Sequence, residues 1–314
     1  MKTLYRLNFR TWSNGDEEHN YAIGVFSTHE EAAEIAQRYL REVKGFCDYA
    51  CEYEILEYPL IGKRSSTDRV WTYEGWDETE NVYETNILDG PFFTSRAAAR
   101  EAMRTAKAEH VRNRWLVLDW NIGQCEWTEG FFRDYDNGEP VPTLAELRGK
   151  LREYIQPRTM CGVEFEYRDH VMYGFPLAVG EQLFLLAEDD DFLLSGFTVR
   201  RLRDIYELGD RKGIYQTIAE KEGLTDFPAP DVDVTDWRAV FSSLQKLDKH
   251  IIIEREYEPD FFRLGVIEQV GQDHVLFRHY DADGIWQEPA KILYRDITSV
   301  TFDDRYANIF SRHI

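Results

Sequence analysis

The sequence predicts an α+β protein in two parts. The front part reads as tandem strand-strand-helix-strand repeats, and the rear part as two small β-barrel-like repeats with helices between them. Two observations carry this prediction. The chain aligns on itself once in each part, and aromatic-rich segments with the alternation of half-buried strands precede Ala-rich helix starts. A length of 314 residues suits two domains of ordinary size, and 43% apolar residues are enough for packed cores.

The front repeat rests on an ungapped alignment of residues 24–33 with residues 90–99. In the first copy we expect Thr28 to cap a helix and Glu31 to close a capping box with it. In the second copy Thr94 or Ser95 takes the cap position. A three-stranded sheet with one helix leaves one apolar face uncovered, and pairing two such units buries that face.

The Gly-Val-Phe-Ser-Thr-x-Glu-Glu-Ala stretch at residues 24–32 resembles a small uncharacterised bacterial domain family. The resemblance covers roughly residues 1–61 and extends more weakly over the second copy. It implies an architecture, and it brings no catalytic residues with it.

The rear repeat is an ungapped alignment of residues 183–205 with residues 275–297, both ending in Arg-Asp-Ile. Each copy reads strand, Gly-marked bend, strand, acidic turn, strand, and a last strand that closes on this triplet. Glycines in such runs mark the bulges that small curled sheets need. We expect the Asp of the triplet to end a strand and the Ile to fill the core. The pattern is similar to that of SH3-like or Sm-like small barrels.

Turn-rich segments give the expected boundaries. A break near Gly138 leads into a connector helix capped by Thr143 with Glu146, which ends before Pro157. The predicted parts are a duplicated domain at 1–136 (repeats at about 1–61 and 68–136), a connector helix at 137–157, and a duplicated small-barrel domain at 158–314 (repeats at about 160–208 and 250–302). Helices are expected at about 210–222, 235–249 and 304–312.

The formal net charge is −21, and both parts contribute to it. Up to Pro157 there are 19 Lys and Arg against 28 Asp and Glu, and the rest of the chain has 18 against 30. Such a field repels nucleic-acid backbones and anionic membranes, and it attracts basic proteins. No stretch has the pattern of a signal peptide or a membrane span, and the four cysteines are scattered. We therefore expect a cytoplasmic protein with reduced thiols.

The sequence contains no recognisable catalytic, phosphate-binding or metal-binding motif, so we expect a protein that is not an enzyme and has no cofactor. The candidate partner-binding residues lie in two acidic turns at equivalent repeat positions and around two tryptophans flanked by carboxylates. Solvated hairpin turns and partly buried aromatics are the alternative interpretation of these residues. The candidates are Glu188, Asp189, Asp190, Asp191, Asp281, Asp283, Trp286, Trp76, Asp77 and Glu78.

These observations favour a non-catalytic acidic protein, similar to bacterial immunity-type proteins, that neutralises a basic toxin or effector domain by direct binding. One alternative is an enzyme or small-ligand-binding protein with a cleft between the two halves, using Asp204 or Asp296 with a histidine. Another is a nucleic-acid-associated Sm-like protein using Arg200, Arg201 and Arg203. It is the weakest of the three, because acidic residues flank this basic cluster.

Overall fold

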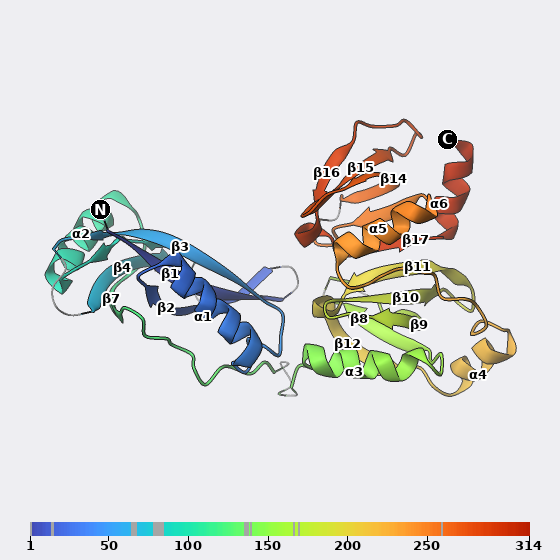
Figure 1. The fold of residues 1–314 in the computed structure, drawn as a ribbon, viewed down its shortest axis with the longest axis horizontal. Coiled ribbons are helices and arrows are strands. Elements are labelled where there is room, and N and C mark those ends of the chain that lie inside the picture. Colours follow the sequence, from blue (N-terminus) through green and yellow to red (C-terminus); the bar gives the residue numbers. More distant parts are fainter. Residues whose placement is uncertain are drawn as a thin grey trace. The chain divides into compact units, whose positions relative to one another are not determined.

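The computed structural model describes residues 2–13, 16–63, 68–77, 85–134, 138, 140–165, 167–168, 170–258 and 260–314. The chain divides into two compact units: Met1–Trp12 with Glu17–Arg133 belongs to the first, and Asp134–Ile314 belongs to the second. Each unit combines helices with antiparallel sheet, which confirms the α+β class (Figure 1).

The first unit is built on a sheet of order β2-β1-β3-β6-β4-β5, with β7 paired to β4. Helix α1 packs on β3, and α2 packs on β4 and β7 (Figure 1). The strands are β1 (Lys2–Ser13), β2 (Asp16–Phe26), β3 (Cys51–Ile61), β4 (Arg69–Asp77), β5 (Thr85–Asp89), β6 (Phe92–Phe93) and β7 (Arg114–Asn121), and the helices are α1 (His29–Glu42) and α2 (Arg96–Glu109).

The strand pairs β1–β3 and β4–β7 place corresponding residues opposite each other. Leu4 lies opposite Tyr58 between β1 and β3, and Val70 lies opposite Trp120 between β4 and β7. Short β6 then joins these two pairs, since Phe92 pairs in parallel with Leu60 at the end of β3. The side chains of these residues belong to one apolar cluster.

The helix starts follow the capping residues that the sequence predicts. Thr28 accepts a hydrogen bond from the backbone N–H of Glu31, and Ser95 accepts one from Ala98. The predicted capping box of α1 is wrong in one detail, because the Glu31 carboxylate accepts from the backbone N–H of Ser27 rather than of Thr28. The side chain therefore reaches one residue beyond the cap.

The second unit is built on one ten-stranded sheet of order β12-β8-β9-β10-β11-β17-β13-β14-β15-β16. Its strands are β8 (Cys161–Phe165), β9 (Met172–Val179), β10 (Leu183–Asp189), β11 (Leu194–Arg201), β12 (Ile205–Asp210), β13 (Ile251–Glu254), β14 (Phe262–Val270), β15 (His274–Tyr280), β16 (Ala290–Leu293) and β17 (Ser299–Phe302).

This sheet contains two groups of five strands with the same internal order, fifth-first-second-third-fourth. In each group a 3-10 turn, Leu202–Asp204 or Tyr294–Asp296, precedes the fifth strand. The Asp of Arg-Asp-Ile thus lies in this turn, which corrects the expectation that it ends a strand. The Ile does fill the core: Ile205 and Ile297 are both buried.

The two groups meet where β11 pairs with β17, and Val199 lies opposite Val300 at this seam. Both valines belong to the largest core cluster, which also contains residues from each group and from α5. The opposite face of the sheet carries two smaller clusters, one packed with α3 and one with α6. The helices are α3 (Leu144–Ile155), α4 (Ile214–Lys221), α5 (Trp237–Leu247) and α6 (Arg305–Phe310).

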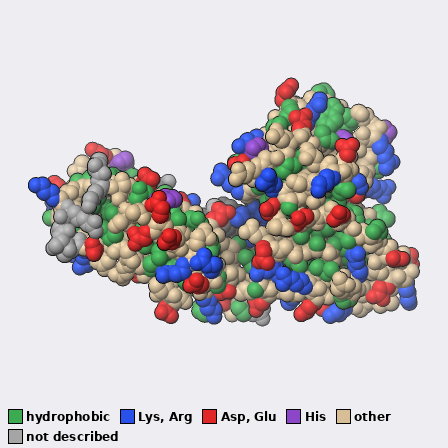
Figure 2. Space-filling model, in the orientation of Figure 1, with side chains coloured by type: hydrophobic (Ala, Val, Ile, Leu, Met, Phe, Trp, Pro, Cys, Tyr) green, Lys and Arg blue, Asp and Glu red, His purple; other side chains and the backbone are tan. Residues whose placement is uncertain are grey.

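The connector helix starts as predicted, because Thr143 and Glu146 exchange both hydrogen bonds of a capping box. The helices predicted at 210–222 and 235–249 are present but shorter at both ends. Charged side chains of both signs are interspersed over the face of each unit shown in Figure 2.

Candidate functional site

The first acidic turn is a tight hairpin between β10 and β11. Asp190 and Leu193 exchange both backbone hydrogen bonds, at 2.9 and 3.0 Å, which leaves a two-residue loop. Both loop residues adopt the left-handed backbone conformation, with φ of 49° at Asp191 and 67° at Phe192. Turns of this kind favour Asn-Gly or Asp-Gly. A phenylalanine there carries backbone strain of about 1–2 kcal/mol.

The strained Phe192 ends a stack of aromatic and cationic groups. Its ring stacks on Tyr215 at 5.8 Å with an interplanar angle of 13°. The Arg211 guanidinium lies between Tyr215, at 3.6 Å, and Tyr173, at 3.4 Å. This stack fixes the position of the turn, because three elements contribute to it: the β10–β11 hairpin, β9 and the start of α4.

Apolar side chains beside this turn are exposed: Leu193 is 50% exposed, Ile214 65% and Tyr215 40%. Asp190 and Asp191 are exposed as well. We call the following residues the acidic hairpin surface: Asp190, Asp191, Phe192, Leu193, Ile214 and Tyr215.

Two of the predicted carboxylates of this turn face inward. Glu188 is half-buried, and burial raises its pKa although Arg200 and Arg168 oppose the shift. Asp189 accepts from the backbone N–H of Phe192 at 3.4 Å, and burial raises its pKa as well. Only Asp190 and Asp191 are therefore available as surface contacts.

The second acidic turn is a longer loop, so the two turns are equivalent in sequence but not in shape. The Asp281 carboxylate accepts from the backbone N–H groups of Asp283 and Ile285, at 3.0 and 2.9 Å, and from Gln287 Nε2 at 3.0 Å. Asp281 therefore organises its own loop, although Asp281 and the neighbouring Asp283 are both exposed.

The two candidate tryptophans are held in place by neighbours. Trp286 packs edge-on against Tyr280 at 5.0 Å and lies under Arg278. Trp76 lies in strand β4, opposite Arg114.

Asp77 also belongs to β4, where it accepts a 3.3 Å hydrogen bond from the backbone N–H of Asn113. Glu78 lies outside the described residues.

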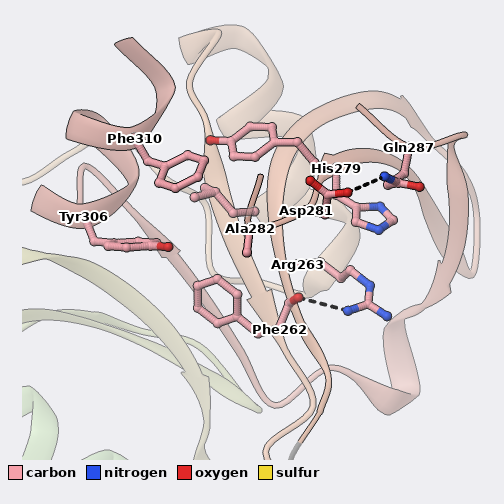
Figure 3. A pocket seen from close by; sticks show the side chains of 10 residues that line it. Phe262, Arg263, His279, Asp281, Ala282, Gln287, Tyr306 and Phe310 are labelled. Carbon is pink, nitrogen blue, oxygen red and sulfur yellow. Dashed lines mark hydrogen bonds between the residues drawn. The ribbon is translucent and has the colours of Figure 1, made fainter. Parts of the chain in front are cut away.

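A cavity of about 500 Å³ opens beside Asp281 (Figure 3). Aromatic side chains from β14, β15 and α6 line one side of it, and polar side chains line the other. Sequence reasoning missed this cavity because its walls come from segments that are distant in the chain. Its lining residues are Phe262, Arg263, Leu264, His279, Tyr280, Asp281, Ala282, Gln287, Tyr306 and Phe310.

The residues expected for a catalytic site have structural partners instead. Asp204 is 2% exposed; it pairs with Arg201 and accepts hydrogen bonds from Tyr167 and Tyr257. Asp296 pairs with Arg255 at 3.5 Å. Within the described part of the chain, neither aspartate makes a hydrogen bond to a histidine.

Two of the three arginines expected for nucleic-acid binding are buried, whereas the side chain of Arg203 is 26% exposed and lies 3.8 Å from Asp204. Arg200 is 1% exposed and Arg201 6%. Arg200 Nη1 lies 2.7 Å from a carboxylate oxygen of Glu256, and Arg168 Nε lies 2.6 Å from the other oxygen. Burial opposes the ionisation of Glu256, yet the two arginines outweigh it and hold the pKa of Glu256 below its ordinary value. These groups tie the two five-strand groups together rather than form a basic groove.

Among the described residues, no three His, Cys, Asp or Glu side chains come together as metal ligands. None of the described helices combines the length and apolar composition needed to cross a bilayer. No family model, curated protein or solved structure matches this chain.

Proposed function

We propose that this protein is a non-catalytic, cytoplasmic binding protein that neutralises a basic toxin or effector domain, and that the acidic hairpin surface is its contact. The observation that carries the proposal is the strained turn: Asp191 and Phe192 both keep left-handed backbone conformations beside exposed apolar side chains. Strain of this kind persists where the surrounding structure enforces it, and it is concentrated at functional sites.

The chemistry of this surface supports a basic partner. Carboxylates at Asp190 and Asp191 attract Lys and Arg, while Tyr215 and Leu193 offer apolar area for the stems of those side chains. Aromatic anchors surrounded by complementary charge are typical of strong contacts in protein interfaces. The net charge of −21 adds long-range steering of a basic partner.

We further propose that the first unit is a duplicated strand-strand-helix-strand domain and the second a pair of SH3-like or Sm-like small barrels. The shared register of the pairs Leu4–Tyr58 and Val70–Trp120 supports the first duplication. The repeated strand order with a 3-10 turn before each fifth strand supports the second. On this interpretation, the scaffold presents loops for binding rather than a catalytic centre.

The test is affinity capture by the tagged full-length protein from its native lysate at about 50 and 300 mM salt, because exposed charge contacts weaken with ionic strength. A double variant, Asp190→Asn with Asp191→Asn, removes two carboxylates and keeps residues that tolerate the turn. The matched control, Asp283→Asn with Glu288→Gln, removes the same charge from two exposed positions of the other loop.

We expect a basic protein that is retained in stoichiometric amount at low salt and loses its activity when bound. The hairpin variant should bind it at least roughly tenfold more weakly, mainly through slower association, while the control variant binds normally. An acidic partner, or equal retention by the hairpin variant and the wild type, would refute the acidic hairpin surface as the contact.

A further inference from the structure

We propose that the cavity between β14, β15 and α6 binds a small planar aromatic anion, which is a second function separate from the acidic hairpin surface. The cavity has an aromatic side and a cationic side, shown in Figure 3. Each side limits the chemical groups that a ligand of this cavity can carry.

The aromatic side offers ring faces and edges that are not covered. Phe262 is 44% exposed and Tyr306 53%, and their rings meet edge to face at 6.3 Å. Behind them, Phe310 stacks on Tyr280 at 5.5 Å with an interplanar angle of only 4°. Figure 3 shows the rings of Phe262, Tyr306 and Phe310 on one side of the cavity and the side chains of His279 and Gln287 on the other. A planar ring is the ligand group that such a wall accommodates best, because aromatic groups gain from stacked and edge-on contacts beyond area burial.

The cationic side is formed by Arg263. Its guanidinium donates to the backbone carbonyl of Phe262 at 3.0 Å and lies over the ring of Phe261. Within the described ranges, no carboxylate lies within ion-pair distance of it. It therefore supplies the charge for an anionic ligand group.

Two further polar groups, Asp281 and His279, line the cavity beside Arg263. The Asp281 carboxylate is already engaged by three hydrogen bonds within its own loop. Burial lowers the pKa of His279, and Arg263 lowers it further, so this imidazole is neutral at pH 7 and can donate or accept a hydrogen bond. Its Nδ1 has no hydrogen-bond partner in the described structure.

The size of the cavity sets the size of the ligand. About 500 Å³ falls within the range of roughly 300–1,000 Å³ that is usual for small-molecule sites. It accommodates a fused ring with one carboxylate or phosphate. Because the walls belong to two paired strands and a helix capped by Asp304, the site is largely formed before binding.

The test is calorimetric titration of the full-length protein with indole-3-acetate, adenosine monophosphate and neutral indole. The two anions distinguish a carboxylate ligand from a phosphate ligand, and indole measures the ring alone. The variants are Arg263→Gln and Ala282→Trp, which narrows the cavity from an exposed position, with Arg295→Gln as a control that removes an exposed arginine outside the cavity.

We expect at least one anion to bind at one site per chain, and indole to bind roughly tenfold or more weakly. Arg263→Gln should remove this preference for the anion, Ala282→Trp should abolish binding, and Arg295→Gln should leave it unchanged. Equal affinity for indole and both anions, an unchanged isotherm for Arg263→Gln, or no binding of any probe at millimolar concentration would each overturn the proposal. None of these results depends on the basic partner or on the acidic hairpin surface.

Discussion

Phe192 is the residue at which local preference and tertiary structure conflict most clearly. A left-handed backbone costs a phenylalanine about 1–2 kcal/mol relative to glycine, and the stack on Tyr215 returns about 0.5–1.5 kcal/mol. The backbone cost and the stacking energy are of similar size, so the Phe192 side chain adds little to the stability of the folded protein. This balance favours a role for the ring at the surface rather than in the core.

Two substitutions separate the backbone strain from the stack. Phe192→Ala keeps the backbone cost and loses the stack, whereas Phe192→Gly loses both. We therefore expect the glycine variant to be more stable than the alanine variant by about 1 kcal/mol. Urea unfolding at equilibrium measures this difference, and equal midpoints for the two variants would show that the turn is not strained.

At the scale of elements, the seam between β11 and β17 depends on buried charge as well as on apolar packing. Glu256 follows β13, and its side chain is 9% exposed between Arg168 and Arg200. Removing one partner of such a buried pair leaves the other charge without compensation. The ion pairs of Glu256 with Arg168 and Arg200 therefore form only when the two five-strand groups are correctly packed.

Glu256→Gln should lower the free energy of unfolding by about 3 kcal/mol at pH 7. The pKa of Glu256 is depressed in the folded protein, so its contribution is present above the unfolded value of 4.5 and lost as the pH falls through the lower folded value. The difference between wild type and variant should therefore shrink below about pH 4.

Unfolding curves between pH 2.5 and 7 measure this difference. Asp296→Asn, at the half-exposed pair with Arg255, is the control and should cost less than about 1 kcal/mol. A pH-independent difference between wild type and Glu256→Gln would contradict the assignment.

At the scale of the whole molecule, the second unit is one cooperative structure although its strand order repeats. Its main core cluster contains Leu185 and Val199 from the first five strands, Val240 from α5, and Ile253 and Phe277 from the second five. Neither five-strand group buries this surface alone, and each would expose a paired edge at the seam.

We expect a fragment of residues 134–314 to fold and to unfold in one cooperative transition. A fragment of residues 134–234 should lack a cooperative transition, because it loses α5 and the second half of the core. Near-ultraviolet circular dichroism during urea unfolding distinguishes the two behaviours. A sharp transition in the shorter fragment would instead show that a single five-strand group is an independent domain.

The sequence by itself determined the α+β class, the helix starts at Thr28 and Thr143, and the strand periods, because these depend on hydrogen bonds and side-chain faces within a few residues. It left the start of α2 open between Thr94 and Ser95, and the structure has Ser95 as the cap. The sequence also located the acidic turn at Asp190 and Asp191. It could not separate the inward Glu188 from these exposed neighbours, since burial is set by strands that pair across the sheet.

Only the tertiary structure brought Tyr215 and Arg211 to Phe192, and Tyr306 to Phe262 and Arg263. It also buried two residues that the sequence offered as functional candidates, Arg200 and Asp204, in ion pairs. These contacts join residues that are up to 56 positions apart in the chain. Sheet register and helix packing decide them, and local sequence does not encode either.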